Sequence, residues 1–474
     1  MNKNKTSVKF VCNSCGYESV QWYGKCPSCG EWGSMKEFRE EKGNKGKKSR
    51  FDREAKRGNL RELGENRPIK LSEITTNKFE RFSSGIGELD RVLGGGFVPG
   101  EVVLLAGEPG IGKSTLLLSL GDGGESGKTG EEGERTILYV SGEESPQQIK
   151  QRAARLGISG ENLVILAETN VEIIIEVTQE IGKKGVNIEL LIVDSVQTLW
   201  SEDFDGAVGS VSQVKGCTQK LIELAKILGI AIVLIGQINK DGEIAGPMML
   251  SHMVDAVLFL EGERYTELRL LRGLKNRFGP TDEVGVFRMS EKGMEEVKNP
   301  SEIFLGERPH FADSESASRG KGEVGSIVIC AMEGTRPMLL EIQALVTKSS
   351  LAIPRRVVSG VDYNRVSLLT AVLQKNLHIP LYDQDIFIKT GGGFKVSEPA
   401  GDLGICLAII SSFKNLPIVP KTVAFGEVGL LGEVRRVNGE EKRIKEAKKL
   451  GFSNILSSTS IKNLSEAVGK SKGN

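Results

Sequence analysis

The sequence predicts an α/β protein whose central unit is a parallel sheet carrying a phosphate-binding loop. A small metal-binding unit precedes it and an α+β unit follows it. The first of three supporting observations is a G-x-x-x-x-G-K-[ST] motif between an apolar run and a helical pattern. The second is a series of apolar runs, ending in polar residues, that alternate with helical patterns. The third is a tight cluster of four cysteines near the N-terminus.

Composition narrows the class of protein before any motif is used. The 474 residues suggest about three domains. The 63 basic and 62 acidic residues nearly balance, so net charge does not mark a nucleic-acid binder and any basic surface must be local. No apolar run approaches the roughly 18 residues of a membrane helix, and no signal-peptide core follows Met1. We therefore expect a cytoplasmic protein without a membrane partner.

The cysteine cluster consists of two Cys-x-x-Cys pairs separated by ten residues, namely Cys12, Cys15, Cys26 and Cys29. In a reducing compartment this spacing favours metal binding over disulfides. Four thiolates complete the tetrahedral coordination of Zn²⁺ and leave no open position, so we expect a structural zinc site. The unit is assigned to residues 1–36.

Aromatic and basic residues around this unit have two interpretations each. We expect Trp22, Tyr23 and Trp32 to cover the metal site rather than to stack on nucleobases. Residues 36–70 contain 13 Lys and Arg against 7 Asp and Glu and little apolar periodicity, so 37–70 is assigned to a flexible basic linker. Such a linker is either a plain tether or a non-specific contact to nucleic-acid phosphates, and the sequence favours neither.

The phosphate-binding loop has the flanking pattern that it needs. The apolar run 102–106 predicts a buried strand before it, and residues 116–118 open a helix after it. Glycines let backbone N–H groups surround the phosphates, and the helix N-terminus adds partial positive charge. We expect Lys113 to reach the β- and γ-phosphates of ATP and the Ser114 hydroxyl to bind Mg²⁺. The expected nucleotide-binding residues are Gly107, Glu108, Pro109, Gly110, Ile111, Gly112, Lys113, Ser114 and Thr115.

Later strands end in polar residues suited to nucleotide hydrolysis, because ligands of parallel sheets bind at the carboxyl ends of the strands. These residues are Glu143 and Glu144 after strand 136–140, Asp194 after strand 189–193, and Gln237 after strand 230–236. We expect Asp194 to hold the metal shell and Gln237 to sense the γ-phosphate. Glu143 is preferred over Glu144 for orienting the attacking water.

A second Gly-Lys-Thr sequence, at residues 127–129, is not a phosphate-binding loop. The first glycine of the motif would fall on Asp122, and no buried strand precedes it. Residues 121–134 are therefore assigned to a Gly/Glu-rich loop. Its first glycines predict that the helix after the phosphate-binding loop ends early.

Two cations follow a strand-like segment at 268–271. Lys275 and Arg277 are two residues apart, so on an extended chain they point the same way. One interpretation is an arginine finger that reaches the nucleotide of a neighbouring subunit. The other is a charged hairpin end.

The last unit, from about residue 310, shows apolar strands near 325–332, 338–346 and 386–389 and a helix near 404–413. It also contains a local basic stretch formed by Lys348, Arg355, Arg356 and Arg365. This stretch is either a DNA-backbone surface or ordinary surface charge.

With these motifs, the chain resembles the RadA (Sms) family of bacterial DNA repair and recombination proteins over nearly its full length. The resemblance rests on the cysteine finger, the segment 84–90, the phosphate-binding loop, the segment 140–145 and the Lys-Asn-Arg-Phe-Gly sequence at 275–279. The central unit, assigned to 71–300, is similar to the RecA recombinase core.

The resemblance implies a homohexameric ring that hydrolyses ATP with Mg²⁺ and acts as a helicase on single-stranded and branched DNA. It further implies branch migration of recombination intermediates together with the RecA recombinase, and a place at the nucleoid. By the same resemblance, Lys113 and Ser114 bind nucleotide and metal. Lys275 and Arg277 contact ATP across the subunit interface and affect DNA binding.

The unit at 310–474 resembles the proteolytic domain of Lon protease but lacks its catalytic pair. Ala400 takes the position of the nucleophilic serine, and the position of the lysine falls near Glu441. A Ser–Lys dyad needs a hydroxyl and an amine, so we expect no peptidase activity. A nucleotide-switched recombination factor that does not translocate, and an ATP-dependent protease, are the alternatives to the motor.

Overall fold

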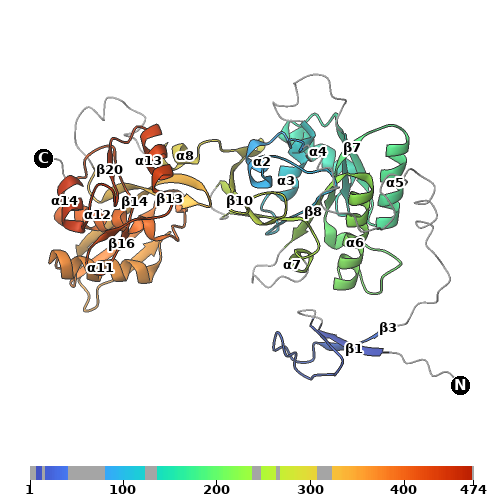
Figure 1. Ribbon diagram of the computed structural model, residues 1–474, viewed down its shortest axis with the longest axis horizontal. Helices are drawn as coiled ribbons and strands as arrows, with labels where there is room; N and C mark the ends of the chain where they lie inside the picture. The colour runs from blue at the N-terminus through green and yellow to red at the C-terminus, as the bar shows by residue number, and fades with distance from the viewer. Residues whose placement is uncertain are drawn as a thin grey trace, which may run out of the picture.

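The computed structural model describes residues 7–12, 17–40, 81–122, 136–237, 247–262, 267–306 and 323–471. Each of two large units is built on a sheet with helices packed against it, and a small sheet lies near the N-terminus (Figure 1). Within the described residues, no helix is both long and apolar enough to cross a membrane.

The N-terminal unit is a three-stranded antiparallel sheet with the order β2 (Glu18–Ser19), β1 (Ser7–Cys12), β3 (Met35–Glu40). Because β3 pairs with β1 as far as Glu40, residues 37–40 are strand rather than linker. The remaining linker residues, 41–70, lie outside the described residues.

The two tryptophans that we expect to cover the metal site keep much of their surface exposed. Trp22 is 57% exposed and Trp32 is 75% exposed. The small core consists of Cys12, Cys26 and Met35, with Phe10 packed against them. The cysteines themselves fill the interior of so small a unit, and the bulky indoles remain at its surface.

The central unit is built on a nine-stranded sheet with the order β12-β11-β10-β9-β4-β8-β7-β5-β6. The six strands from β9 to β6 are parallel, and β10, β11 and β12 form an antiparallel meander at one edge. The strands are β4 (Val102–Gly107), β5 (Thr136–Ser141), β6 (Leu163–Ala167), β7 (Ile188–Asp194), β8 (Ala231–Gln237), β9 (Ala256–Glu261), β10 (Leu268–Asn276), β11 (Val284–Ser290) and β12 (Gly293–Glu296).

Helices cover both faces of this sheet, which is why its central strands are apolar without alternation. In β4, Val103 and Leu105 pack on one side and Val102 and Leu104 on the other. The first side carries α2 (Gly87–Leu93), α3 (Lys113–Leu118) and α4 (Pro146–Leu156). The second side carries α5 (Val171–Lys183), α6 (Val211–Leu228) and α7 (Pro247–Leu250).

Local signals set several of these helix ends. Ser145 and Gln148 form a capping box at the start of α4, and the side chains of Asn170 and Ser210 cap α5 and α6. The helix after the phosphate-binding loop is short, as expected, because α3 passes into a single 3₁₀ turn at Ser119–Asp122. Most of the Gly/Glu-rich loop, from residue 123 on, lies outside the described residues.

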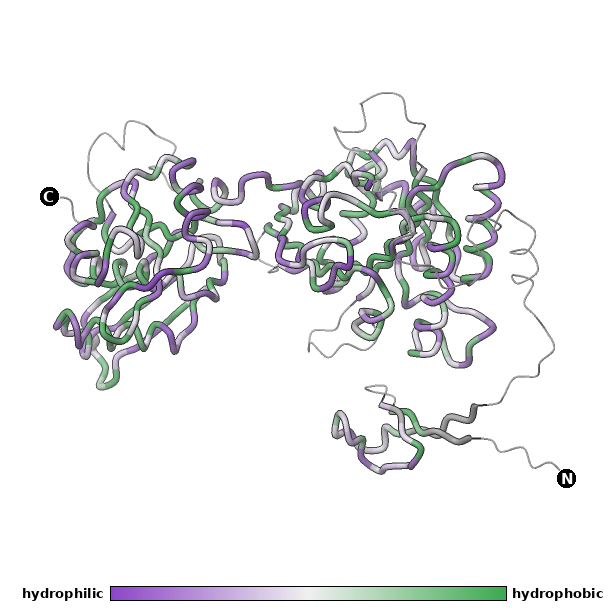
Figure 2. The backbone as a smooth tube through the Cα atoms, in the orientation of Figure 1, coloured by the Kyte–Doolittle hydropathy of each residue, from purple (hydrophilic) through white to green (hydrophobic). Residues whose placement is uncertain are grey.

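The C-terminal unit is a six-stranded mixed sheet with the order β15-β16-β14-β13-β17-β20. Its strands are β13 (Ser326–Glu333), β14 (Arg336–Lys348), β15 (Arg356–Ser359), β16 (Gln384–Thr390), β17 (Thr422–Ala424) and β20 (Asn454–Leu456). One face packs on α11 (Tyr363–Leu377), α12 (Asp402–Lys414) and α14 (Leu464–Ser471). The other contacts α8 (Pro300–Gly306) and α13 (Glu440–Lys449), and β18 (Glu427–Val428) with β19 (Val434–Arg435) forms a separate ribbon. In both large units hydrophobic and hydrophilic stretches alternate along the backbone (Figure 2).

The turn between β13 and β14, called here the docking turn (residues 333–336), attaches the C-terminal unit to the central unit. Glu333 accepts a hydrogen bond from Arg272 of β10 at 2.6 Å. Arg336 donates to Glu88 of α2 at 2.5 Å, and Glu88 is almost fully buried. Two ion pairs with little exposure therefore hold this turn against the central unit.

Close backbone contact reinforces the docking turn. Gly334 has a φ of +58°, and a Cβ there would lie 1.7 Å from the carbonyl oxygen of Asp282. Leu268 and Leu270 of β10 pack against the core of the C-terminal unit. The meander of the central sheet is thus part of the interface between the two units.

Candidate nucleotide-binding site

The phosphate-binding loop connects β4 to α3 as the motif predicts. Gly110 and Gly112 have φ values of +76° and +114°, which favour glycine. A Cβ at Gly107 would lie 2.5 Å from the Leu260 carbonyl oxygen, so this position also needs glycine. The buried Lys113 side chain turns back into the loop and donates from Nζ to the Gly107 and Glu108 carbonyls, each at 2.8 Å.

Burial lowers the pKa of Lys113 to about 8, and the negative charges of Asp194, Glu143 and Glu108 oppose this shift. The amine therefore faces acidic groups from the ends of two neighbouring strands. Phosphate oxygens are the natural additional partners of a cation in this position.

Asp194 is the last residue of β7, and the parallel pairing places it beside Ser141 of β5. Its Oδ2 accepts a hydrogen bond of 2.6 Å from the hydroxyl of Tyr139. Burial, together with the adjacent Asp194 charge, raises the pKa of Tyr139, so its hydroxyl remains a donor. The sequence reasoning missed Tyr139, because in an apolar strand it resembles any other core residue.

Glu143 accepts hydrogen bonds from two polar groups at the ends of the strands. The Ser195 hydroxyl donates to Glu143 Oε1 at 2.9 Å, and the Gln237 amide donates to the same oxygen at 3.4 Å. Glu144 instead pairs with Arg152 of α4. The structure thus brings Glu143 and Gln237 together and directs Glu144 to a different partner.

The oxygen donors at this site fit Mg²⁺. The metal prefers carboxylate and hydroxyl oxygens and keeps several waters when it binds nucleotide phosphates. Ser114 follows Lys113 in the first turn of α3. Asp194 is the last residue of β7, and its negative charge acts on Lys113. Asp194 Oδ2 accepts the hydrogen bond from Tyr139, and this bond does not use Oδ1.

Lys275 lies near the end of β10, Arg277 lies in the bend just after it, and both contact residues 251–255. Lys275 Nζ donates to the carbonyls of Ser251 and Val254 at 2.6 and 2.7 Å. Arg277, which is about half exposed, forms an ion pair with Asp255 at 3.4 Å. Burial and the Arg277 charge both lower the pKa of Lys275. The two cations therefore belong to one cluster with residues 251–255.

The thiols of the N-terminal unit fit a zinc ion. The Sγ atoms of Cys12, Cys26 and Cys29 all lie within 4.8 Å of one another, and those of Cys12 and Cys29 are 3.7 Å apart. Thiolates about 2.3 Å from a tetrahedral zinc have separations of this size. The fourth expected ligand, Cys15, lies outside the described residues.

Comparison with known proteins decides the family. Residues 10–37 match the family model described as "Rubredoxin metal binding domain", and residues 66–243 match the one described as "AAA domain". DNA repair protein RadA of Bacillus subtilis (strain 168) is 47% identical over 452 residues, which cover 95% of this chain and 92% of the relative. This chain belongs to the RadA family.

Other relatives agree with this assignment, and the resemblance expected from the motifs is confirmed. DNA repair protein RadA of Halalkalibacterium halodurans is 46% identical over 96% of this chain and 93% of the relative. Its namesake from Listeria monocytogenes is 44% identical over the same shares of each chain. The solved structure titled "Crystal structure of the RadB recombinase" is 26% identical and covers 46% of this chain and 99% of its own, at a TM-score of 0.35.

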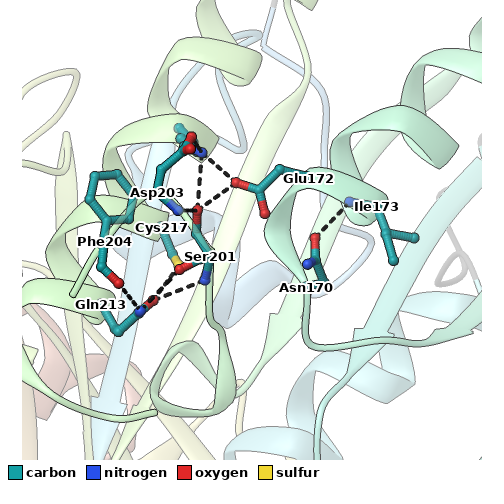
Figure 3. A network of polar contacts seen from close by, with 9 residues as sticks. Asn170, Glu172, Ile173, Ser201, Asp203, Phe204, Gln213 and Cys217 are labelled. Atoms are coloured by element: carbon teal, nitrogen blue, oxygen red, sulfur yellow. Dashed lines mark hydrogen bonds and ion pairs between the residues drawn. The ribbon is translucent and has the colours of Figure 1, made fainter. Parts of the chain in front are cut away.

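The RadA-family chain also contains a polar network around Ser201, in the segment between β7 and α6 (Figure 3). This network anchors the segment to α5 and α6. The Ser201 hydroxyl donates to Glu172 at 2.6 Å, and Lys220 donates to Ser201 Oγ at 3.1 Å and to Glu172. Burial disfavours the charge of Lys220, but its bonds to Asp203 and Glu172 outweigh burial and raise its pKa. This Ser–Lys contact therefore lacks the neutral amine that would activate a nucleophile.

The basic stretch of the C-terminal unit is largely committed to internal contacts. Arg365 pairs with the buried Asp402, and Arg356 donates to the carbonyls of Leu381 and Gln384. Arg355 forms an ion pair of 3.5 Å with Asp385. The interpretation of this stretch as a free DNA-backbone surface is therefore weakened for these three arginines.

The Lon-like positions contain no Ser–Lys pair. Ala400 is buried in the 3₁₀ turn Pro399–Gly401, and Glu441 is exposed on α13. Beside them, Glu398 and the fully buried Arg443 form a two-pronged ion pair with distances of 2.8 and 2.6 Å. A guanidinium stays protonated at every working pH, so it cannot replace a catalytic amine.

Proposed function

We propose that this chain is a DNA-dependent ATPase, and specifically a ring helicase that promotes branch migration of recombination intermediates with the RecA recombinase. The coarser statement, a DNA repair and recombination ATPase, follows from its RadA relatives and its AAA-type unit. The observation that carries the proposal is the convergence of Lys113, Asp194, Glu143 and Gln237 at one edge of the central sheet.

The geometry supports a role for each of these residues. Lys113 and the loop glycines bind the phosphates of ATP, while Ser114 and Asp194 hold Mg²⁺, which neutralises phosphate charge. Glu143 orients the attacking water, because its carboxylate faces Gln237 and Ser195, whereas Glu144 is paired with Arg152. A γ-phosphate near Gln237 would compete for the amide that now contacts Glu143. This provides a direct link between nucleotide state and the hydrolytic carboxylate.

The test compares two neighbouring carboxylates. ATP hydrolysis with and without single-stranded DNA is measured for wild type, Lys113→Ala, Glu143→Gln and Glu144→Gln. We expect Glu143→Gln to lose about 10²–10⁴-fold in rate, Lys113→Ala to lose nucleotide binding, and Glu144→Gln to stay near wild type. Equal losses in the two glutamine variants would contradict the assignment of Glu143, and DNA-independent hydrolysis in wild type would contradict the motor.

We also propose that Lys275 and Arg277 act on the nucleotide of the adjacent subunit in a homohexamer. Where measured in other proteins, such fingers contribute about 10³–10⁵ in rate. Lys113→Ala and Arg277→Ala rings should each be inactive. Mixed rings should recover activity, because some interfaces combine an intact loop with an intact finger. Mixed rings as inactive as their parents would exclude a shared site.

We assign residues 310–474 to a non-proteolytic ring scaffold and DNA platform, residues 71–300 to the motor, and the chain to the nucleoid. Ala400 and Glu441 support the loss of peptidase chemistry. A forked-DNA strand-displacement assay distinguishes the motor from an accessory factor that binds ATP without translocating. Casein cleavage by a homogeneous sample would restore the protease alternative.

A further inference from the structure

We propose that Tyr139 is a positioning residue that fixes Asp194 for binding of the nucleotide-associated Mg²⁺. This inference rests on the proposed ATPase function and goes beyond it, because neither the motifs nor the family comparison assigns a role to this tyrosine. The decisive contact is the 2.6 Å hydrogen bond from the Tyr139 hydroxyl to Asp194 Oδ2.

The strand register explains how this contact arises. Tyr139 pairs with Ile192 and Ser141 pairs with Asp194, so Tyr139 lies two residues before the level of Asp194. Residues two apart on a strand point to the same face, so Asp194 and Ile192 share the face that Tyr139 occupies. The phenol spans the distance along the strands and brings its hydroxyl to the polar edge of the sheet.

Among the described residues, Asp194 is the hydrogen-bond partner of the Tyr139 hydroxyl, and the ring packs against apolar side chains. Tyr139 is 2% exposed and belongs to an apolar cluster that includes Leu117, Ile149 and Ile192. A buried hydroxyl is costly unless it is hydrogen-bonded, and phenylalanine would fill nearly the same volume. The position therefore combines a packing role for the ring with a separate role for the oxygen.

The role of the oxygen is geometric. The terminal torsion of an aspartate is broad, so an unrestrained carboxylate samples many orientations. Mg²⁺ requires near-ideal octahedral geometry and often reaches carboxylates through its waters. A donor fixed on Oδ2 aims Oδ1, in the way that outer-shell partners orient metal ligands elsewhere, with typical effects of about 10–100-fold on metal affinity.

The experiment uses the full-length protein and the Tyr139→Phe variant, which removes only the hydroxyl. Binding of a fluorescent ATP analogue is titrated in EDTA and at increasing Mg²⁺, and ATP hydrolysis is measured over the same Mg²⁺ range. Tyr382→Phe, at a position that is 72% exposed, is the matched control. Thermal unfolding of each variant reports whether the ring still packs.

We expect Tyr139→Phe to need about tenfold more Mg²⁺ for half-maximal analogue binding and hydrolysis. Its affinity for the analogue in EDTA and its rate at saturating Mg²⁺ should stay within about twofold of wild type. An unchanged Mg²⁺ requirement would overturn the proposal. So would an equal loss of affinity with and without Mg²⁺, because that pattern belongs to packing. If wild type itself neither bound nor hydrolysed ATP, the proposed function would fail instead.

Discussion

Replacement of Arg443 by methionine should destabilise the C-terminal unit strongly. The guanidinium is fully buried and binds both oxygens of Glu398, the Asn438 carbonyl and the Cys330 carbonyl. Removing one partner of a buried ion pair costs about 3–5 kcal/mol, because it leaves an uncompensated charge. Since Glu398 keeps 26% of its side-chain exposure, we take the lower end, about 3 kcal/mol.

For a unit of about 150 residues, this change corresponds to a fall of roughly 10 °C in the midpoint of thermal unfolding. The assay is scanning calorimetry of the full chain, in which the transition of the C-terminal unit is followed. Arg435→Met is the control, because Arg435 is 56% exposed and its ion pairs with Glu433 and Glu427 should contribute under about 1 kcal/mol.

A double variant makes the reasoning stricter. Arg443→Met combined with Glu398→Met should be more stable than Arg443→Met alone, because no charge is left without its partner. The reasoning would be refuted if Arg443→Met melted within 2–3 °C (about 1 kcal/mol) of Arg435→Met, or if the second substitution only added to the loss.

Two further predictions concern ionisable and metal sites. The pKa of Lys113 is lowered to about 8, so nucleotide affinity should fall about tenfold between pH 7 and pH 9 as the cation is lost. Between pH 8 and the ordinary pKa of lysine, Lys113 is more protonated in the unfolded chain than in the folded one. The free-energy cost of burying Lys113 therefore shrinks as pH rises through this range. Lys113→Arg should show no such affinity change, and a flat wild-type titration would contradict the prediction. Metal analysis should find about one zinc per chain. Chelation of this zinc should unfold the N-terminal unit and leave nucleotide binding intact. An ordered N-terminal unit in zinc-free protein would exclude the zinc site.

Local sequence was sufficient wherever one segment determines its own structure. The phosphate-binding loop, its strand and its short helix were predicted because glycine positions and apolar runs act over a few residues. Helix α6 (Val211–Leu228) likewise has local end signals, because the Ser210 side chain caps its start and Gly229 ends it in the left-handed conformation.

Contacts between distant segments could not be predicted in this way. Tyr139 looked like a core residue because its partner lies 55 positions away. The large exposure of Trp22 and Trp32 was also not predicted, because it depends on how the small core of Cys12, Cys26 and Met35 packs. Arg365 resembled a surface cation because the buried Asp402 that neutralises it comes 37 residues later.

The docking turn has a mechanical consequence for strand β10. Arg272, which is ion-paired to Glu333 of the C-terminal unit, and Lys275 of the cationic pair lie three residues apart on that strand, or about 10 Å. Gly334 also lies close against the Asp282 carbonyl, so we expect a force on the C-terminal unit to reach β10 through the docking turn. Tension on DNA bound by the C-terminal unit would therefore reach β10. This strand carries Lys275, one of the two cations that we assign to the nucleotide of the adjacent subunit.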